Sequence, residues 1–186
     1  TPATVSITVS TPGVPAAADV SGVTVAYDSP GMAIDLSGSI TGVHSSVTVA
    51  SSPAHGTISV SGDVVTYTPT TGYYGADSFS YTATGPGGTS APATVTLQVA
   101  VPATPLVSDV SNVAVPYNST GTGIDLSSAI TGVHTSVAVG TNPAHGTVTI
   151  SGDVVTYIPT TGYYGADSFS YTATGPGGTS TPATVT

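Results

Sequence analysis

The chain of 186 residues contains no cysteine, no tryptophan, no lysine and no arginine. Without cysteine, neither a disulfide nor a thiolate metal site can form. Without Lys or Arg, nothing neutralises phosphate, so the composition argues against nucleic acid and against anionic membrane surfaces as partners. No apolar run approaches the roughly 20 residues of a membrane span, and we therefore expect no membrane insertion.

The chain instead contains a long internal repeat. "PTTGYYGADSFSYTATGPGGTS" occupies residues 69–90 and returns unchanged at residues 159–180, 90 positions later. Residues 11–100 and 101–186 align as two copies of one repeat, which predicts two tandem domains. An enzyme rarely needs two copies of one site, whereas a stalk needs many copies of its building block.

Both ends of the chain fall inside the repeat. Residues 1–10, "TPATVSITVS", align with residues 91–100, "APATVTLQVA". We therefore expect residues 1–10 to be the last strand of a preceding repeat, and the chain to be part of a longer one. The second copy stops before it reaches its own counterparts of Leu97 and Val99, so we expect its last strand to be truncated.

Differences between the two copies alternate along the sequence. Where "GVTVAY" becomes "NVAVPY", the residues Val23, Val25 and Tyr27 keep their identity and the residues between them change. A period of two is typical of a β-strand with one buried face and one wet face, and helical spacing appears nowhere. In the first copy, this pattern and the turns predict seven strands, at Val20–Tyr27, Ala33–Ile40, Ser46–Ser51, Thr57–Ser61, Val64–Thr68, Ser78–Thr84 and Ala93–Val99.

The predicted fold class is all-β, with two tandem immunoglobulin-like β-sandwiches of about seven strands each. A closed barrel is the alternative. Gly62-Asp63 fits a two-residue type II′ hairpin, which needs Gly first. The residues predicted to face the core are Val23, Val25, Tyr27, Ile34, Leu36, Ile40, Val47, Val49, Ile58, Val60, Val65, Tyr67, Phe79, Tyr81, Val95 and Leu97.

One further set of motifs resembles a known family. Each copy has Pro-x-His-Gly-Thr, then Tyr-x-Pro, then Gly-x-Asp-Ser-Phe-x-Tyr, beginning at Pro53 and at Pro143. This spacing resembles the bacterial immunoglobulin-like, cadherin-like tandem repeats of giant secreted surface adhesins. The resemblance implies an extracellular or cell-surface location and a part in cell adhesion or biofilm formation. Such repeats often carry additional acidic residues where this chain has "VPAAADV" and "TGPGG", and those acids are candidates for calcium ligands.

Calcium is therefore one candidate ligand. The ion takes six to eight oxygens, several of them from clustered carboxylates, but every Asp here is solitary in sequence and Glu is absent. Structural or solvated roles are the main interpretation of the Asp residues. Calcium remains an alternative near Asp19 and Asp109, at the domain junctions, and no other cofactor is expected.

The identical stretch supplies the remaining site candidates. Immunoglobulin-like sandwiches often have a corner tyrosine just before a strand, with its hydroxyl bonded to nearby backbone, and Tyr73 and Tyr74 both lie at that place. Asp77 fits a corner where a carboxylate accepts backbone N–H groups. Exposed paired tyrosines could instead stack on sugar rings. The structural motif that we predict comprises Tyr73, Tyr74, Asp77, Tyr163, Tyr164 and Asp167.

The sequence favours a non-enzymatic spacer in a large bacterial surface or secreted adhesin, with neighbouring repeats of the same chain as its partners. No Gly-x-Ser-x-Gly or His-Glu-x-x-His motif is present. The alternatives are a calcium-rigidified adhesion module, a carbohydrate-binding accessory module of a secreted hydrolase, and a subunit of an extracellular filament that exchanges strands. In that last case residues 1–10, with Val5, Ile7 and Val9 facing inward, would insert into a neighbouring molecule and join copies head to tail. Otherwise we expect them to pair along the edge of the first domain.

Overall fold

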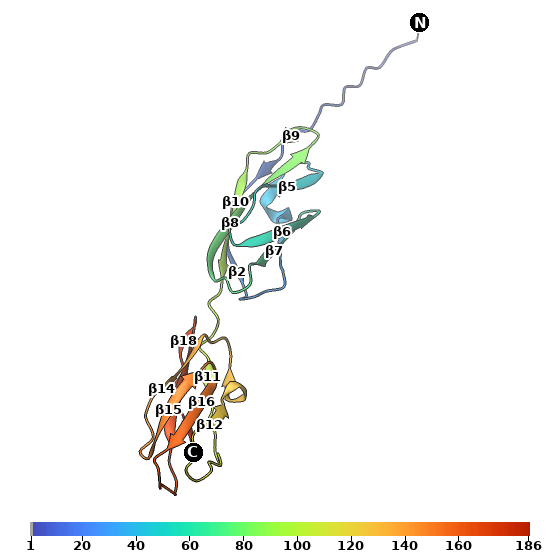
Figure 1. The fold of residues 1–186 in the computed structure, drawn as a ribbon. Coiled ribbons are helices and arrows are strands. Elements are labelled where there is room, and N and C mark those ends of the chain that lie inside the picture. The colour runs from blue at the N-terminus through green and yellow to red at the C-terminus, as the bar shows by residue number, and fades with distance from the viewer. Residues whose placement is uncertain (1) are drawn as a thin grey trace. The chain divides into compact units, whose positions relative to one another are not determined.

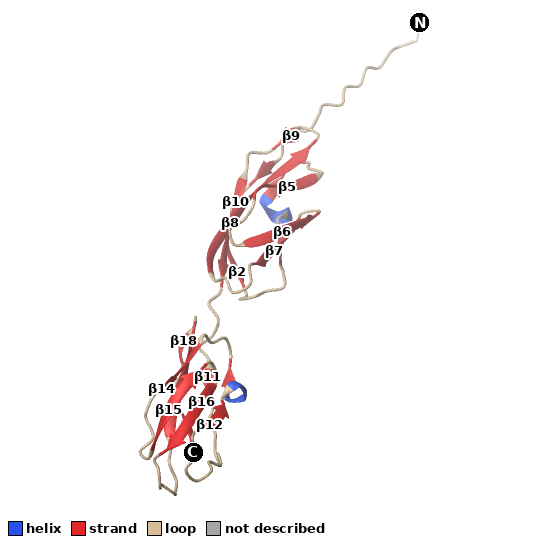
Figure 2. Ribbon diagram, in the orientation of Figure 1, coloured by secondary structure: helices blue, strands red, loops and turns tan. Residues whose placement is uncertain are grey.

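The computed structural model describes residues 2–186, which form two compact units. The first unit ends at Ala100 and the second comprises Val101–Thr186 (Figure 1). Both units are built from strands, and their helical content is one short 3-10 turn each, Ser37–Ser39 and Ser127–Ala129 (Figure 2). Neither turn could cross a membrane, and no other helix occurs in the described part of the chain.

The first sheet of unit 1 has β10 at its centre. Strand β10 (Ala93–Val99) runs parallel to β2 (Val20–Val25) and antiparallel to β8 (Gly75–Gly85). On its other side, β8 pairs with β5 (Ser46–Ser51), and its end folds back onto β9 (Gly88–Thr89). The last strand of the repeat therefore joins the first strand to the rest of the sheet (Figure 1).

The second sheet of unit 1 has the order β3-β7-β6, all antiparallel. Its strands are β3 (Met32–Asp35), β7 (Val64–Pro69) and β6 (Gly56–Ser61). A short antiparallel pair, β1 (Ala16–Ala17) with β4 (Ile40–Thr41), forms a separate two-stranded sheet. A two-residue loop at Gly62-Asp63 joins β6 to β7, and Gly62 has φ +60°, as the predicted type II′ turn requires.

Unit 2 repeats this plan with one strand fewer. One sheet contains β12 (Thr122–Asp125), β16 (Val154–Pro159) and β15 (Gly146–Ser151), and the other contains β14 (Ser136–Val139), β17 (Phe169–Gly175), β18 (Gly178–Thr179) and β19 (Ala183–Val185). The short pair is β11 (Leu106–Val107) with β13 (Ile130–Thr131). The counterpart of β2 is reduced to a single bridge between Val110 and Val185.

Each unit has its own hydrophobic core between its two sheets, and the fold-class prediction is confirmed. The strands form two separate sheets and not a closed barrel. Burial alternates along β10 from Ala93 to Val99, as expected of a strand with one buried face. Most of the predicted inward residues are buried or half-buried. Val60 is an error, because it is 39% exposed near the end of β6.

Seven strands of four or more residues occur in unit 1, as predicted, and the bounds of Ser46–Ser51 and Ala93–Val99 are correct. The prediction of one strand over Ala33–Ile40 is wrong. The carboxylate of Asp35 accepts the N–H of Ser37 at 2.9 Å, and the chain turns there into the 3-10 segment before it resumes at β4. Asp commonly captures a backbone N–H two residues ahead in this way and thereby ends a strand.

The N-terminal segment also differs from expectation. Residues 2–10 form no strand, and the side chains of Val5, Ile7 and Val9 are 81%, 84% and 89% exposed. The expected pairing of this segment with the edge of the first domain is therefore wrong for residues 2–10, while Thr1 lies outside the described residues. Its insertion into a neighbouring molecule stays a prediction.

Candidate functional site

The repeated motif converges on one carboxylate in unit 1, that of Asp77 at the start of β8. Its Oδ1 accepts the N–H groups of Ala54 (3.0 Å) and Ser78 (2.8 Å), and its Oδ2 accepts that of His55 (3.0 Å). The hydroxyl of Tyr67 donates a fourth hydrogen bond to Oδ2 at 2.9 Å. These bonds tie the turn before β6 to the first residues of β8.

The Asp77 carboxylate stays ionised despite its burial. Burial acts to raise its pKa, but the four hydrogen bonds that it accepts act in the opposite direction and together hold the pKa below its usual value. The matching bonds of Asp167 have the same net effect on its pKa against the same opposing burial. The Asp77 carboxylate has a structural role, because both of its oxygens already accept hydrogen bonds from the turn before β6, from Tyr67 and from Ser78.

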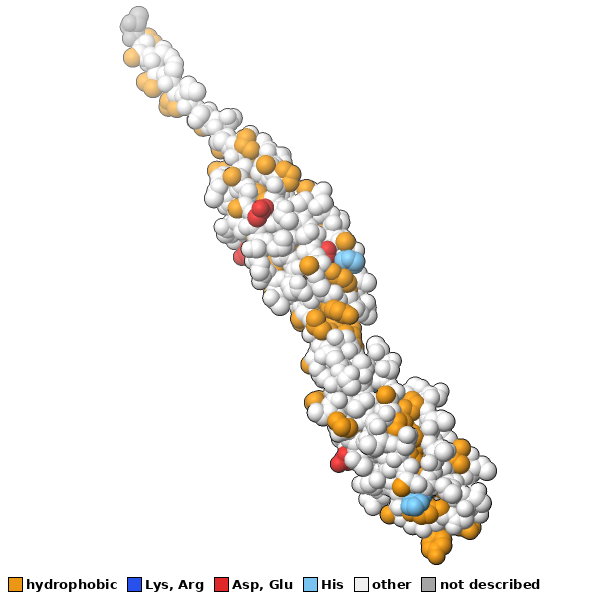
Figure 3. Space-filling view, turned by 90° about the vertical axis from the view of Figure 1, so that its left-hand side faces the viewer, with side chains coloured by type: hydrophobic (Ala, Val, Ile, Leu, Met, Phe, Trp, Pro, Cys, Tyr) orange, Lys and Arg blue, Asp and Glu red, His pale blue; other side chains and the backbone are white. Residues whose placement is uncertain are grey.

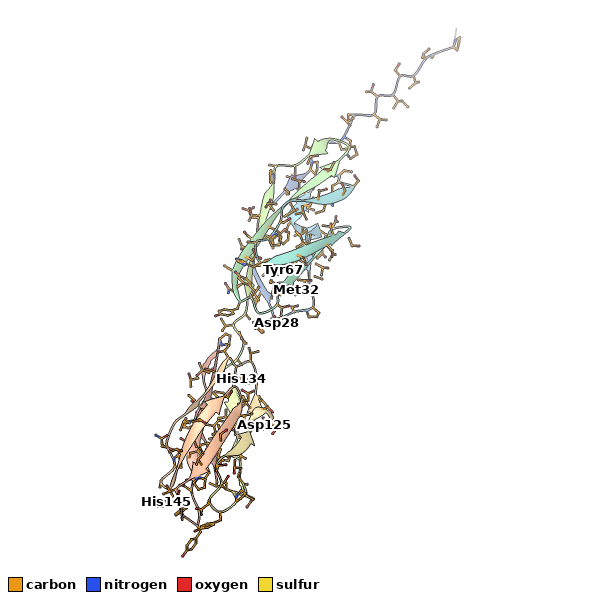
Figure 4. All side chains as sticks on the ribbon, in the orientation of Figure 1. Asp28, Met32, Tyr67, Asp125, His134 and His145 are labelled. Carbon is orange, nitrogen blue, oxygen red and sulfur yellow. The ribbon has the colours of Figure 1, made fainter. Side chains whose placement is uncertain are left out.

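Tyr67 stands at the centre of this corner, fully buried between the sheets of unit 1 (Figure 4). Its hydroxyl also lies 3.1 Å from the carbonyl oxygen of His55, so it joins the carboxylate to the turn. Burial, then the neighbouring carboxylate, raises the pKa of Tyr67, and the same causes raise the pKa of Tyr157 to about 12. Both hydroxyls therefore remain protonated donors.

His55 and Gly56 complete the corner. The His55 ring stacks on Tyr73 with a centroid separation of 4.1 Å and an interplanar angle of 8°. Gly56 lies so close to Tyr67 that an added Cβ would stand 2.4 Å from the tyrosine ring. The Pro-x-His-Gly-Thr signature is thus a packing motif, and His145 with Tyr163 repeats it in unit 2 at 4.1 Å and 13°.

The adjacent residues Tyr73 and Tyr74 have different roles. The Tyr73 hydroxyl donates to the carbonyl oxygen of Ala76 at 2.5 Å, which is the local bond of a corner tyrosine, and Tyr163 does the same with Ala166 at 2.6 Å. Tyr74 instead points outward and is 44% exposed, while Tyr164 is 85% exposed.

The two calcium candidates have structural partners. Asp19 Oδ1 accepts the N–H of Thr94 at 2.7 Å, and Asp109 Oδ1 accepts that of Thr184 at 2.7 Å. Each therefore fixes the first strand region of its unit to the last strand. No group of three or more His, Cys, Asp or Glu side chains that could hold a metal ion occurs among residues 2–186. Calcium near Asp19 and Asp109 stays a prediction.

The pair formed by His44 and Asp63 was not predicted from the sequence. The His44 Nε2 lies 3.1 Å from Asp63 Oδ1, and His134 repeats the contact with Asp153 at 3.0 Å. The bond to the Asp carboxylate is the main cause that raises the pKa of each histidine. Nineteen positions separate the partners in each pair, and only their repetition at the same spacing in both copies could have indicated it.

Unit 2 has a cavity of about 300 Å³ that opens beside the start of β17. Its walls include Val113, Val115, Tyr117, Phe169 and Val185. The walls are mainly apolar, and the carboxylate of Asp167 among them already accepts the N–H groups of Ala144 and His145.

The family model for the bacterial Ig domain matches residues 3–98 and again residues 102–186. The chain belongs to this family. The resemblance to bacterial immunoglobulin-like tandem repeats is thereby confirmed, and both copies of the signature described above lie within the matched regions.

Solved structures give more distant similarities. A glycoside hydrolase family 107 endo-fucoidan hydrolase is 18% identical over 94% of this chain and 34% of its own, with a TM-score of 0.36. The protocadherin GammaB4 extracellular domain is 13% identical over 92% of this chain and 34% of its own (TM-score 0.37), and the BSP domain of a biofilm associated protein is 18% identical over 94% and 29% (TM-score 0.25). The chain thus spans about a third of their lengths, and the family assignment rests on the family model. A search of curated proteins found no match.

Proposed function

We propose that the two units are non-enzymatic spacer domains of a bacterial cell-surface or secreted adhesion protein. The observation that carries this proposal is the use of the repeated polar residues. Asp77, Tyr67 and Tyr73 all bond to their own unit, and their counterparts in unit 2 do the same. Polar residues that recur in each copy and form hydrogen bonds within that copy stabilise the fold. The polar groups that form these bonds are therefore not free to bind a ligand or to react with a substrate.

Composition supports the same role. A chain with nine Asp residues and no Lys or Arg carries only negative charge near neutral pH and repels anionic polymers, which suits a domain that holds other domains apart. The hydrogen-bonding capacity of the buried side chains is also satisfied, since no buried side-chain nitrogen or oxygen among the described residues lacks a partner.

Carbohydrate binding is a second candidate, and the exposed ring of Tyr74 favours it. This ring is 44% exposed in unit 1, where the sheet is complete, and an exposed tyrosine can stack on a sugar ring. Tyr73 cannot serve in the same way, because its ring is already stacked on His55. A sugar site would therefore depend on Tyr74 alone.

Surface display tests the spacer function directly. The chain would be inserted between a bacterial surface anchor and a small reporter domain, and access of a bulky ligand to the reporter would be measured by flow cytometry. We expect access to rise relative to the directly anchored reporter, and to rise equally with an unrelated pair of sandwich domains of similar length. No gain in access would contradict a spacer.

A glycan array with the purified chain separates the two candidates. The spacer proposal expects no saturable binding by the wild type. Saturable binding that Tyr74→Ala abolishes and Val60→Ala leaves intact would establish the carbohydrate function in its place, because both side chains are exposed to a similar degree.

A further inference from the structure

Strand β6 is an edge strand with no partner on its outer side among the described residues. Its six residues pair with β7 in unbroken register, from Gly56 opposite Pro69 to Ser61 opposite Val64. No strand follows it in the sheet order β3-β7-β6 (Figure 1). Strand β15 has the same place and the same unbroken register in unit 2. Each unit therefore presents a row of backbone groups with which a further strand can pair.

The pairing with β7 fixes which backbone groups of β6 point outward. In an antiparallel pair, alternate residues bond to the partner strand, and the residues between them point away from it. The N–H of Thr70 donates to the carbonyl oxygen of His55 at 2.8 Å, which sets the phase of this alternation. Ile58 and Val60 therefore direct their N–H and C=O groups outward, and within the described part of the chain these groups have no hydrogen-bond partner.

The other edges of unit 1 are protected against such pairing, whereas the edge of β6 is not. The register of β2 on β10 shifts between Val95 and Leu97. The register of β5 on β8 shifts between Val49 and Ser51, and irregularities of this kind twist an edge away from a partner. Strand β3 has only four residues and ends at Asp35. Strand β6 contains no register shift, no proline and no charged side chain.

A second copy of the same edge fits these outward groups. In an antiparallel arrangement centred on Ser59, Ile58 of one copy lies opposite Val60 of the other, and the reverse holds across the two-fold axis. Val60 is 39% exposed although it shares a face with Ile58, which packs against the core. Ile58 of the second copy would cover it. Thr57 of one copy would face Ser61 of the other, so hydroxyl groups meet on the outer face.

Charge favours the same arrangement. The ionisable residues that flank β6 are His55 before it and Asp63 after it. Centring the contact on Ser59 places Asp63 of one copy opposite His55 of the other, whereas a parallel contact in register would bring two carboxylates together. The strand itself is uncharged, and Figure 3 shows acidic side chains only as isolated patches on the visible face. The repulsion expected from a net charge of -9 is therefore weak at this edge.

We propose that the free edge of β6 or β15 pairs with the same edge of a second copy of the chain, antiparallel and centred on Ser59 or its counterpart Thr149. The contact is isologous between like units, because the same residues contribute from both sides. It joins two three-stranded sheets into one continuous sheet. This self-association would add to the role of a spacer and does not depend on it.

A matched pair of lysine variants tests the contact. Ser59→Lys/Thr149→Lys places like charges directly opposite each other at its centre. Thr94→Lys/Thr184→Lys adds the same charge to the other sheet of each unit, away from the edge. All four side chains are exposed, so both variants should fold, which circular dichroism checks. Both variants also lower the net negative charge, so general repulsion would not explain a loss of association in the first alone.

Sedimentation velocity over a wide range of concentration, at physiological salt, would measure the association. We expect concentration-dependent dimers for the wild type and for Thr94→Lys/Thr184→Lys, and complete loss of them for Ser59→Lys/Thr149→Lys. A monomeric wild type would overturn the proposal. Dimers that survive in Ser59→Lys/Thr149→Lys would also overturn it, as would equal loss in both variants.

The register can be tested by disulfide formation, since the chain has no cysteine of its own. Ser59→Cys/Thr149→Cys places two thiols at a directly opposed pair, whose Cα separation of about 4.5 Å lies within the span of a disulfide. In Ser61→Cys/Ser151→Cys, each thiol lies four positions along the strand from its counterpart, about 13 Å away. We expect disulfide-linked dimers from the first variant on mild oxidation and none from the second. Equal yields would contradict the proposed register.

Discussion

Gly56 and Gly146 lie against the ring that closes each corner, and they show what a single residue type contributes to this fold. The tyrosine ring packs over the glycine backbone, with no room for a side chain. The sequence marks both positions, because His-Gly-Thr occurs in each copy. It could not show the reason, since Gly56 and Tyr67 meet only when β6 and β7 pair in register.

We expect Gly56→Ala to lower the free energy of unfolding of unit 1 by about 1–3 kcal/mol, the usual cost of an overpacked core. The new Cβ would lie 2.4 Å from Tyr67 Cε2 and 2.7 Å from the Thr68 carbonyl oxygen, and neither backbone nor ring can yield easily. Gly38→Ala is the control, because nothing lies within 4 Å of its added Cβ. Guanidinium unfolding measures both, and an equal effect of the two substitutions would contradict this account of Gly56.

Asp77 shows how far the sequence predicts a site residue. Its position before a strand and after a glycine indicated a corner carboxylate. Two of its partners, Ala54 and His55, are more than 20 positions away in a turn whose place is set by the packing of two sheets. The sequence therefore predicts that Asp77 accepts backbone N–H groups, but it does not predict which distant residues donate them.

Elements in this fold depend on their neighbours more than on their own residues. Residues 113–115 have the same alternating valines as residues 23–25, and the sequence predicts a strand in both. Only β2 forms, because only unit 1 supplies a parallel partner along residues 97–99. The strand prediction failed most clearly at Asp35, where a side chain competes for the backbone.

The contact of His44 with Asp63 joins the loop before β5 to the hairpin between β6 and β7, and it should make unit 1 sensitive to pH. The Asp63 carboxylate raises the pKa of His44 above its usual value of 6.5. The pair therefore contributes fully to stability below pH 6.5, and that contribution is lost as the pH rises through the raised pKa of the folded state.

We expect Asp63→Asn to lower the pKa of His44 and to leave that of His134 unchanged, because the latter pairs with Asp153 in the other unit. Proton NMR of the histidine rings against pH measures both residues in one sample. If the pKa of His44 does not fall, or if both values fall together, the specific pair is not the cause.

At the scale of the whole chain, two units of nearly the same sequence should differ in stability. Unit 1 buries Leu97 and Val99 under a complete sheet, while the corresponding place in unit 2 is a cavity of about 300 Å³. Both units otherwise share their corner, their histidine pair and their order of strands. In a polypeptide of residues 1–186, unit 2 should therefore unfold first.

Adding Leu-Gln-Val-Ala after Thr186 should raise the free energy of unfolding of unit 2 toward that of unit 1. Burial of one Leu and one Val contributes about 1.5–3 kcal/mol each, before the entropy of ordering the new residues is subtracted. The control adds Ser-Gln-Ser-Ala, which can offer the same backbone bonds without the apolar side chains. Denaturant unfolding would measure both additions. Tyr74→Phe and Tyr164→Phe variants, each of which alters the tyrosine signal of one unit, would assign the transitions to the two units. If the apolar and polar additions stabilise unit 2 equally, main-chain pairing and not side-chain burial completes the sheet.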